Sequence, residues 1–214
     1  MNVNIRIPTT LNEITLGQYQ EYAKLQDLTE TDLQLKTIEI FCNVPEVVVR
    51  NMKATDIVEI CGIINNMFDT KHQLISMFKM NGVEYGFIPS LEDMSFGEYV
   101  DLDTFIGDND NLHRAVNVLY RPIEHRKGNR YTIKEYEPNT SEIAKDMPLD
   151  AVLGAVVFFY NLGKDLSLVM LNSLDKKNEQ TLAEYLTSQP NGGGTIQSMD
   201  YLTEILQNLN ISLN

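Results

Sequence analysis

The stretch Met77-Phe78-Lys79-Met80-Asn81-Gly82-Val83-Glu84-Tyr85-Gly86-Phe87 is the segment that decides the fold of this 214-residue chain. Two runs rich in apolar and aromatic residues flank Asn81-Gly82, which is the preferred pair for a two-residue type I′ turn. The stretch therefore predicts a β-hairpin. A proline follows at Pro89, and Ser95 with Glu98 has the spacing of a helix-capping box. We therefore expect a strand, a proline stop and a helix start in this order.

The same order of signals occurs near the start of the chain. Residues 3–19 resemble residues 83–99, because each segment contains an alternating run, a proline and a capping-box pair. In the first copy that pair is Thr15 with Gln18. Two unrelated helices that start from similar capping signals would also produce this match, so convergence stays open as the alternative to duplication.

Later segments extend the likeness between the two halves. Residues 36–43 resemble residues 114–121 in the placement of charged and apolar side chains. Residues 52–58 parallel residues 147–152, since each opens an apolar helix with an acid in its first turn, where the helix dipole favours it. The order strand, helix, helix, helix is therefore expected twice.

These patterns predict a mainly α fold of the α+β class, built from two internally duplicated strand–helix–helix–helix halves with β-hairpins and a tethered C-terminal helix. We expect the first half to span residues 1–78 and the second to span residues 79–187, with a hairpin insertion at residues 123–138. Residues 188–214 are expected to form a linker and a C-terminal helical arm.

The insertion carries the locally basic patch of an otherwise acidic chain. Its centre, Arg126-Lys127-Gly128-Asn129, has turn residues, and residues 131–136 alternate with period two, so a hairpin is expected. The basic residues of the patch are Arg121, Arg126, Lys127, Arg130 and Lys134. Two interpretations stay open: a solvated hairpin tip, or a contact with an acidic neighbour such as another copy of the chain. The predicted partner-binding residues here are Arg126, Lys127, Arg130 and Lys134.

Two segments near the C-terminus carry further expectations. Residues 147–174 are apolar almost all round, which predicts a long or broken helix that forms a central core element or an oligomer interface. Residues 188–194 have the composition of a linker. The apolar residues beyond it have helical spacing and are predicted to bind a partner: Met199, Leu202, Leu206 and Leu209. The alternative is that this segment packs back onto its own domain.

Composition excludes several classes of protein. Seventeen basic against 30 acidic residues give a net charge of −13, which disfavours direct binding to nucleic acid. The longest apolar run, residues 151–160, is much shorter than the roughly 20 residues of a membrane span. The first residues lack the cationic and apolar segments of a secretory signal. Cys42 and Cys61 lie in apolar helical stretches and are expected to be inert core thiols.

Catalytic and metal-binding signatures are also missing from the sequence. His72, His113 and His125 lie far apart and do not have metal-ligand spacing. The glycine run at residues 192–194 is not followed by the lysine of a phosphate loop, and the acidic run at residues 101–110 does not have the order of a calcium loop. We therefore predict no catalytic residue, no metal ligand and no cofactor, and we expect the protein not to be an enzyme.

Four segments carry a resemblance to a known group of proteins. They are Asn81-Gly82-Val83-Glu84-Tyr85-Gly86-Phe87-Ile88-Pro89, Ser95-Phe96-Gly97-Glu98-Tyr99, Leu119-Tyr120-Arg121-Pro122-Ile123 and Met147-Pro148-Leu149-Asp150. Together they resemble small acidic proteins encoded in the structural regions of tailed bacteriophages, including crAss-like phages of gut bacteria. The likeness covers most of residues 1–175 and includes no motif with a known chemical role.

The resemblance implies a non-enzymatic structural protein of a tailed-phage virion, as an oligomeric component of the head-to-tail connector or of the tail. It implies manufacture in the cytoplasm of the host bacterium and a final place in the virion. The expected partners are other phage structural proteins and further copies of the chain, without direct contact to nucleic acid or membrane. The alternative is a tail assembly chaperone that binds the tape-measure protein. A host-modulating binding protein is a third possibility.

Overall fold

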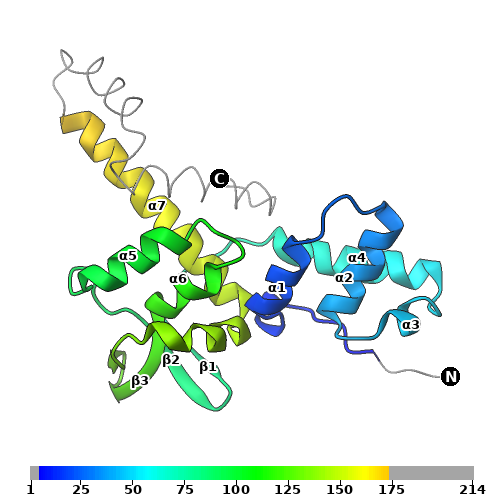
Figure 1. Ribbon diagram of the computed structural model, residues 1–214, viewed down its shortest axis with the longest axis horizontal. Helices are drawn as coiled ribbons and strands as arrows, with labels where there is room; N and C mark the ends of the chain where they lie inside the picture. Colours follow the sequence, from blue (N-terminus) through cyan, green and yellow to red (C-terminus); the bar gives the residue numbers. More distant parts are fainter. Residues whose placement is uncertain (1–4, 174–214) are drawn as a thin grey trace.

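The protein belongs to the α+β class, as expected, and its described residues form two lobes (Figure 1). The computed structural model describes the backbone of residues 5–173 and the side chains up to residue 164, apart from that of Asn139. The elements in chain order are η1 (Leu11–Glu13), α1 (Leu16–Ala23), α2 (Glu30–Phe41), α3 (Glu46–Val49), α4 (Ala54–Phe68), β1 (Met77–Met80), β2 (Val83–Phe87), α5 (Phe96–Phe105), α6 (Leu112–Leu119), β3 (Tyr120–Lys127), β4 (Arg130–Ile133), η2 (Pro138–Asp146) and α7 (Leu149–Ser173).

Both predicted hairpins are present, and they join into one antiparallel sheet with the strand order β1-β2-β3-β4. Asn81 and Gly82 connect β1 to β2 with φ angles of 50° and 83°, which is the backbone that a type I′ turn requires. The middle pairing sets Gly86 of β2 opposite Arg121 of β3. The predicted boundary between residues 78 and 79 falls inside β1, so the whole hairpin lies in the lobe that contains α5, α6 and α7.

Both predicted capping boxes are confirmed. The Thr15 hydroxyl accepts a hydrogen bond from the Gln18 backbone N–H at the start of α1, and the Gln18 side chain accepts one from the Thr15 N–H. Ser95 and Glu98 do the same at the start of α5. These side chains satisfy backbone donors that have no partner within the first helical turn, which explains why both helices begin where the sequence predicts.

The strand predicted for residues 3–7 is wrong over its described part. Ile5 and Ile7 pack against the core in an irregular segment that pairs with no strand. The nearby backbone pairs instead with the start of α7: the Leu16 N–H donates to the Met147 carbonyl at 2.9 Å, and the Leu149 N–H donates to the Ile14 carbonyl at 2.8 Å. An alternating pattern is compatible with a strand, but a strand forms only where a neighbouring backbone is available. The internal duplication stays a prediction.

The first turns of α7 form the centre of the molecule. One hydrophobic core cluster extends through both lobes, and its members between residues 149 and 156 on α7 are almost completely buried. α7 contacts η1 and α1 on one side and α6 on the other (Figure 1). Gly154 permits this packing, because a Cβ at that position would overlap the Gln73 backbone carbonyl. The expected central core helix is therefore confirmed, and it is continuous.

Polar contacts also join the two lobes. The Gln20 side chain on α1 donates hydrogen bonds to the carbonyls of Asn109 at 2.6 Å and Asp110 at 3.1 Å, just before α6. Its amide also lies 3.2 Å from Nδ1 of His113, a buried residue on α6. Because an amide nitrogen only donates, Nδ1 accepts and the ring proton lies on Nε2, which faces the Glu142 carboxylate at 3.3 Å. A neutral His113 therefore fits this junction.

Candidate functional site

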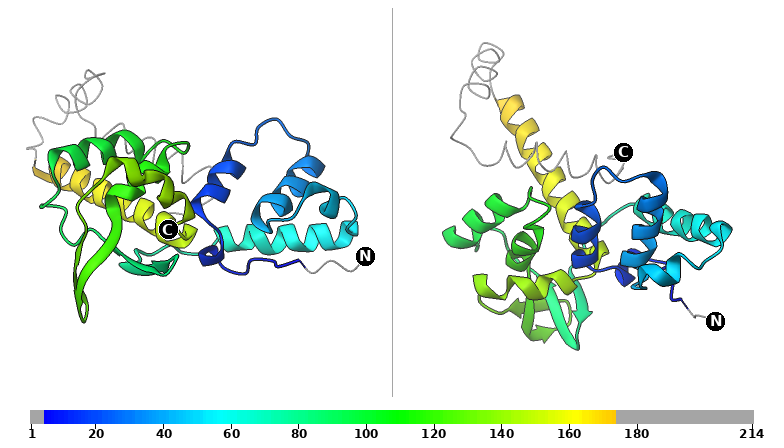
Figure 2. Two further views of the ribbon diagram at one scale, coloured as in Figure 1. Left: turned by 60° about the horizontal axis from the view of Figure 1, so that its bottom comes forward. Right: turned by 45° about the vertical axis from the view of Figure 1, so that its right-hand side comes forward.

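The β3–β4 hairpin is the part of the described chain that extends furthest from the helices of its lobe (Figure 2, left). Its turn is Gly128-Asn129, as the sequence predicts, and Gly128 has a φ of 63° that favours glycine. Lys127 and Arg130 face each other across this turn. The insertion predicted at residues 123–138 therefore is a hairpin, although β3 begins earlier, at Tyr120, and β4 ends at Ile133.

One tyrosine anchors the hairpin to the rest of the sheet. The Tyr131 ring lies over Gly86, where a Cβ would collide with it. Its hydroxyl lies 2.7 Å from the Phe87 carbonyl and 3.1 Å from the Ser76 carbonyl, so it donates to this pair of acceptors. Burial raises the pKa of Tyr131, which keeps the hydroxyl protonated as a donor. The hairpin is thus held against β2 along one face.

The predicted basic residues divide into two groups. Arg126 pairs with Glu84 of β2 at 2.9 Å and donates to the Gly128 carbonyl at 3.0 Å, so its charge is partly used within the fold. Lys127, Arg130 and Lys134 are exposed and form no ion pair with residues 5–173. We call these three residues the basic face. Lys127 and Arg130 flank the turn, whereas Lys134 lies at the base of the hairpin, where its N–H donates to the Pro122 carbonyl at 2.9 Å.

Arg121 does not belong to the exposed basic patch, so its inclusion there is wrong. Its side chain turns into the protein, is 11% exposed, and pairs with Glu98 of α5 at 2.8 Å. Its Nε is buried and has no hydrogen-bond partner among the described residues. Charge patterning along the chain cannot reveal this burial, because the partner Glu98 belongs to a different element of the fold.

The pairing of Arg121 with Glu98 leaves an apolar stripe exposed on α5. Glu98 is buried because it caps the helix and neutralises Arg121. This orientation turns the next face outward, and the side chains there are Phe96, Tyr99 and Val100, which are 82%, 46% and 41% exposed. The sequence alone does not predict this exposure, because apolar residues at helical spacing ordinarily mark the core side. The buried Glu98 at the third helical position is the signal that distinguishes an exposed apolar stripe from one that faces the core.

One hollow lies beside the β3–β4 hairpin and α5, and another lies where the two lobes meet. A groove of about 610 Å³ runs between β4 and the loop before α5, with Arg121, Glu98 and Tyr136 among its lining residues. The Tyr136 hydroxyl donates to Asp101 at 2.7 Å, so this wall of the groove is fixed. Arg121 and Glu98 pair with each other in the groove, whereas Asp93 and Lys134, which also line it, form no ion pair with the described residues.

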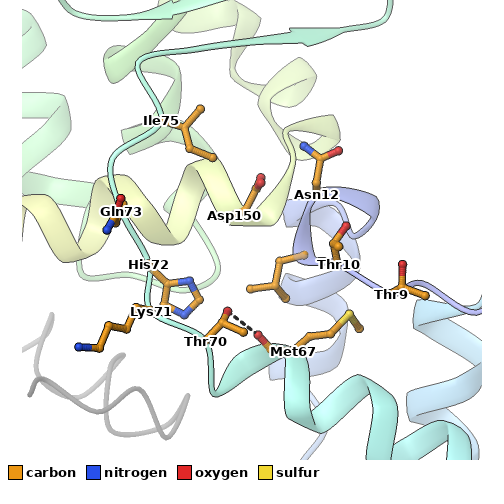
Figure 3. Close-up of a pocket in the computed structure, with 11 residues that line it drawn as sticks. Thr9, Thr10, Asn12, Met67, Thr70, Lys71, His72, Gln73, Ile75 and Asp150 are labelled. Carbon is orange, nitrogen blue, oxygen red and sulfur yellow. Dashed lines mark hydrogen bonds between the residues drawn. The ribbon is translucent and has the colours of Figure 1, made fainter.

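A second hollow of about 370 Å³ lies where η1, the segment after α4 and the start of α7 meet (Figure 3). His72 and Asp150 line it, and burial lowers the pKa of His72. Thr70 donates to the Met67 carbonyl, and the Asp150 carboxylate accepts from the Ala151 N–H at 2.7 Å. Lys71 points away from the other labelled residues (Figure 3). Thr70 and Asp150 therefore serve local helix ends, whereas the buried Nε2 of His72 has no hydrogen-bond partner among the described residues.

The remaining reactive side chains are structural. Cys42 and Cys61 are buried free thiols, as expected, and burial raises the pKa of Cys42 to about 11. No group of His, Cys, Asp and Glu within the described part of the chain is arranged to hold a metal ion.

Among the helices of residues 5–173, none has the length and hydropathy that crossing a bilayer requires. The predicted C-terminal contact residues lie outside the described residues: Met199, Leu202, Leu206 and Leu209.

Comparison of the chain with protein-family models, with curated proteins and with solved structures finds no match.

Proposed function

We propose that this protein is a non-enzymatic structural component of a tailed-phage virion, and that it assembles as an oligomer in the head-to-tail connector or the tail. It is made in the cytoplasm of the host bacterium and remains in the virion. Its partners are other phage structural proteins and further copies of itself. The observation that carries the proposal is the basic face of Lys127, Arg130 and Lys134, exposed on an extended hairpin of a chain of net charge −13.

Charge explains why such a hairpin suits an assembly protein. Copies of a strongly acidic chain repel one another in most orientations, so association at random surfaces is disfavoured. A local basic face is attracted to an acidic surface in one orientation, and complementary potentials of this kind fix the register of an interface and speed the encounter. Tyr131 and Gly86 hold the hairpin rigidly against β2, so little conformational freedom is lost when the tip binds.

Internal duplication and a tethered C-terminal segment complete the proposal. The succession α1, α2, α4 in the first lobe and α5, α6, α7 in the second supports the duplication. The linker composition of residues 188–194 and the helical spacing of the apolar residues after it support a docking arm.

The second candidate is a tail assembly chaperone that binds the tape-measure protein and leaves before the particle matures. The exposed stripe of Phe96, Tyr99 and Val100 favours this candidate, because a chaperone needs an apolar surface for its client. The two candidates differ in a measurable way: a virion component is present in mature particles, and a chaperone is not.

The test is the incorporation of charge-reversed chains into particles of the phage that encodes this protein. A basic-face variant carries Lys127→Glu, Arg130→Glu and Lys134→Glu. A matched control makes the same change in net charge at exposed lysines elsewhere, with Lys53→Glu, Lys71→Glu and Lys164→Glu. We expect the control to be incorporated like the natural chain and the basic-face variant to be depleted. Equal incorporation of both variants would contradict the role of the basic face.

A further inference from the structure

The outward face of α5 has an apolar centre that the fold does not use. Phe96 is 82% exposed in the first turn, and Tyr99 and Val100 follow at three and four residues, so all three lie on one side of the helix. Aromatic side chains exposed in this way are enriched at the centres of protein interfaces. Val58 on α4 is exposed to 61% but is a smaller, non-aromatic side chain. The α5 stripe therefore marks a binding surface.

Acidic side chains border this stripe. Glu92 and Asp93 are exposed in the loop just before α5 and form no ion pair with the described residues. We call the surface formed by Glu92, Asp93, Phe96, Tyr99 and Val100 the α5 face. An apolar centre with a charged edge is the arrangement of a typical interface, in which the edge selects the partner by charge. The partner that fits the α5 face must therefore combine positive charge with aliphatic or planar groups.

The basic face of the hairpin has this chemistry. Lysine and arginine side chains can cover apolar rings with their aliphatic stems while their charged ends reach carboxylates. A guanidinium group can also stack on an aromatic ring. The chain already contains this pairing, since the Arg114 guanidinium lies 3.9 Å from the centre of the Phe105 ring. Arg130 over Phe96, with Lys127 near Glu92 and Asp93, would repeat the same interaction between two molecules.

We propose that the α5 face binds the basic face of a second copy of this chain, head to tail. This inference rests on the proposed function, because it names the surface through which the oligomer forms. The tip of the hairpin, which carries Lys127 and Arg130, extends away from α5 (Figure 2, left), whereas Lys134 and Asp93 line one groove at the base of the hairpin. The tip and the apolar stripe of α5 are therefore different patches on one molecule. A contact between different patches leaves one free face at each end of a dimer. Such heterologous contacts close into a ring or continue as a filament.

The test is a charge exchange measured by sedimentation and native mass spectrometry of the full chain. The hairpin reversal is Lys127→Glu with Arg130→Glu, and the α5 reversal is Glu92→Lys with Asp93→Lys. We expect each reversal alone to weaken self-association by about tenfold or more, since like charges then meet. The two reversals combined in one chain restore attraction, and so does an equal mixture of the two reversed chains.

Uncharged and distant variants complete the design. Phe96→Ser is expected to weaken association, whereas Val58→Ser and Glu59→Lys on α4 are matched controls that leave it unchanged. Circular dichroism of each variant checks that the fold is retained. Weakening by the α5 reversal alone is the informative result, because that reversal makes the chain less acidic and a general effect of net charge would strengthen association. Restoration by the double reversal then supports a direct contact between the two faces.

Several results would overturn the inference. If the hairpin reversal dissociates the oligomer while the α5 reversal and Phe96→Ser do not, the surface that binds the basic face lies elsewhere and the proposed function stands. If Phe96→Ser changes only incorporation into particles, the α5 face binds a different protein. A natural chain that stays monomeric also overturns the inference, and the proposed function fails with it only if the chain is also absent from mature particles.

Discussion

Arg121 Nη1 lies 2.8 Å from Glu98 Oε1, and this buried ion pair joins β3 to the first turn of α5. The second Glu98 oxygen accepts from the Ser95 N–H at 2.7 Å, so one carboxylate both caps the helix and neutralises the arginine. The strand that leads to the basic face and the helix that carries the α5 face are thereby fixed relative to each other. The same contact determines that Phe96 lies outside.

Arg121→Met is expected to destabilise the fold by about 3 kcal/mol, because it leaves the Glu98 carboxylate buried without its cation. Urea unfolding of the variant and the natural chain measures this difference. Adding Glu98→Gln to Arg121→Met removes the buried charge but keeps an acceptor for the cap, so the double variant should recover part of the loss. A loss below about 0.5 kcal/mol for Arg121→Met, the level of an ordinary surface change, would contradict the importance of the pair.

Two glycines inside helices should respond to alanine in opposite directions. Gly62→Ala on α4 adds a Cβ into open space, so it should stabilise the protein by about 0.5–1 kcal/mol through helix propensity. Gly154→Ala on α7 places the Cβ on the Gln73 carbonyl, and overpacking of this kind should destabilise by about 1–3 kcal/mol. Thermal unfolding of both variants provides the comparison. Stabilisation by both substitutions would show that α7 is not packed this closely.

Local signals in the sequence predicted the elements well, for physical reasons that act over short distances. The Asn81-Gly82 turn and the capping boxes of Thr15 and Ser95 depend on neighbouring residues alone, and all three are confirmed. Two other features depend on which backbone segments lie next to each other in the fold: both hairpins join in one sheet, and residues 5–7 form no strand. No local pattern encodes these neighbours.

The candidate site was predictable to a smaller extent. Charge alone identified Lys127, Arg130 and Lys134, because exposed residues need no partner from elsewhere in the fold. It misplaced Arg121, since the burial of that side chain depends on Glu98, 23 positions away in the chain. The exposure of Phe96 follows from the same long-range pair and was missed for that reason.

The junction between the lobes should weaken in mild acid. Burial, followed by the nearby Lys145, lowers the pKa of His113 below its usual 6.5, although Glu142 opposes the shift. The folded state therefore binds this proton less readily than the unfolded state does. The neutral His113 side chain contributes to the stability of the folded state above about pH 6.5, and this contribution is lost as the pH falls below that value. Denaturant unfolding between about pH 7.5 and about pH 5 measures the decline.

His113→Asn should reduce this decline, because asparagine retains an acceptor for Gln20 but does not titrate. The remaining slope belongs partly to His72, whose pKa burial also lowers. An unchanged slope in His113→Asn would show that the residue does not gain its proton on unfolding. Proton NMR of the imidazole resonances would then identify the group that titrates.

Removal of residues 190–214 should leave the described fold intact and weaken higher-order association. The hydrophobic core formed by the described residues closes around the first turns of α7. The free energy of unfolding of the truncated chain should therefore match that of the full chain, while sedimentation shows smaller assemblies. Unfolding of the truncated chain would mean that the segment belongs to the core, which is the alternative that the sequence left open.

Quantitative mass spectrometry of purified phage particles tests the central claim most directly, by measuring the copy number of this chain against that of the major capsid protein. A structural component of the connector or tail is predicted to be present in mature particles at the fixed, low copy number of a ring. Absence from mature particles, together with expression during infection, would contradict the claim and favour the assembly chaperone.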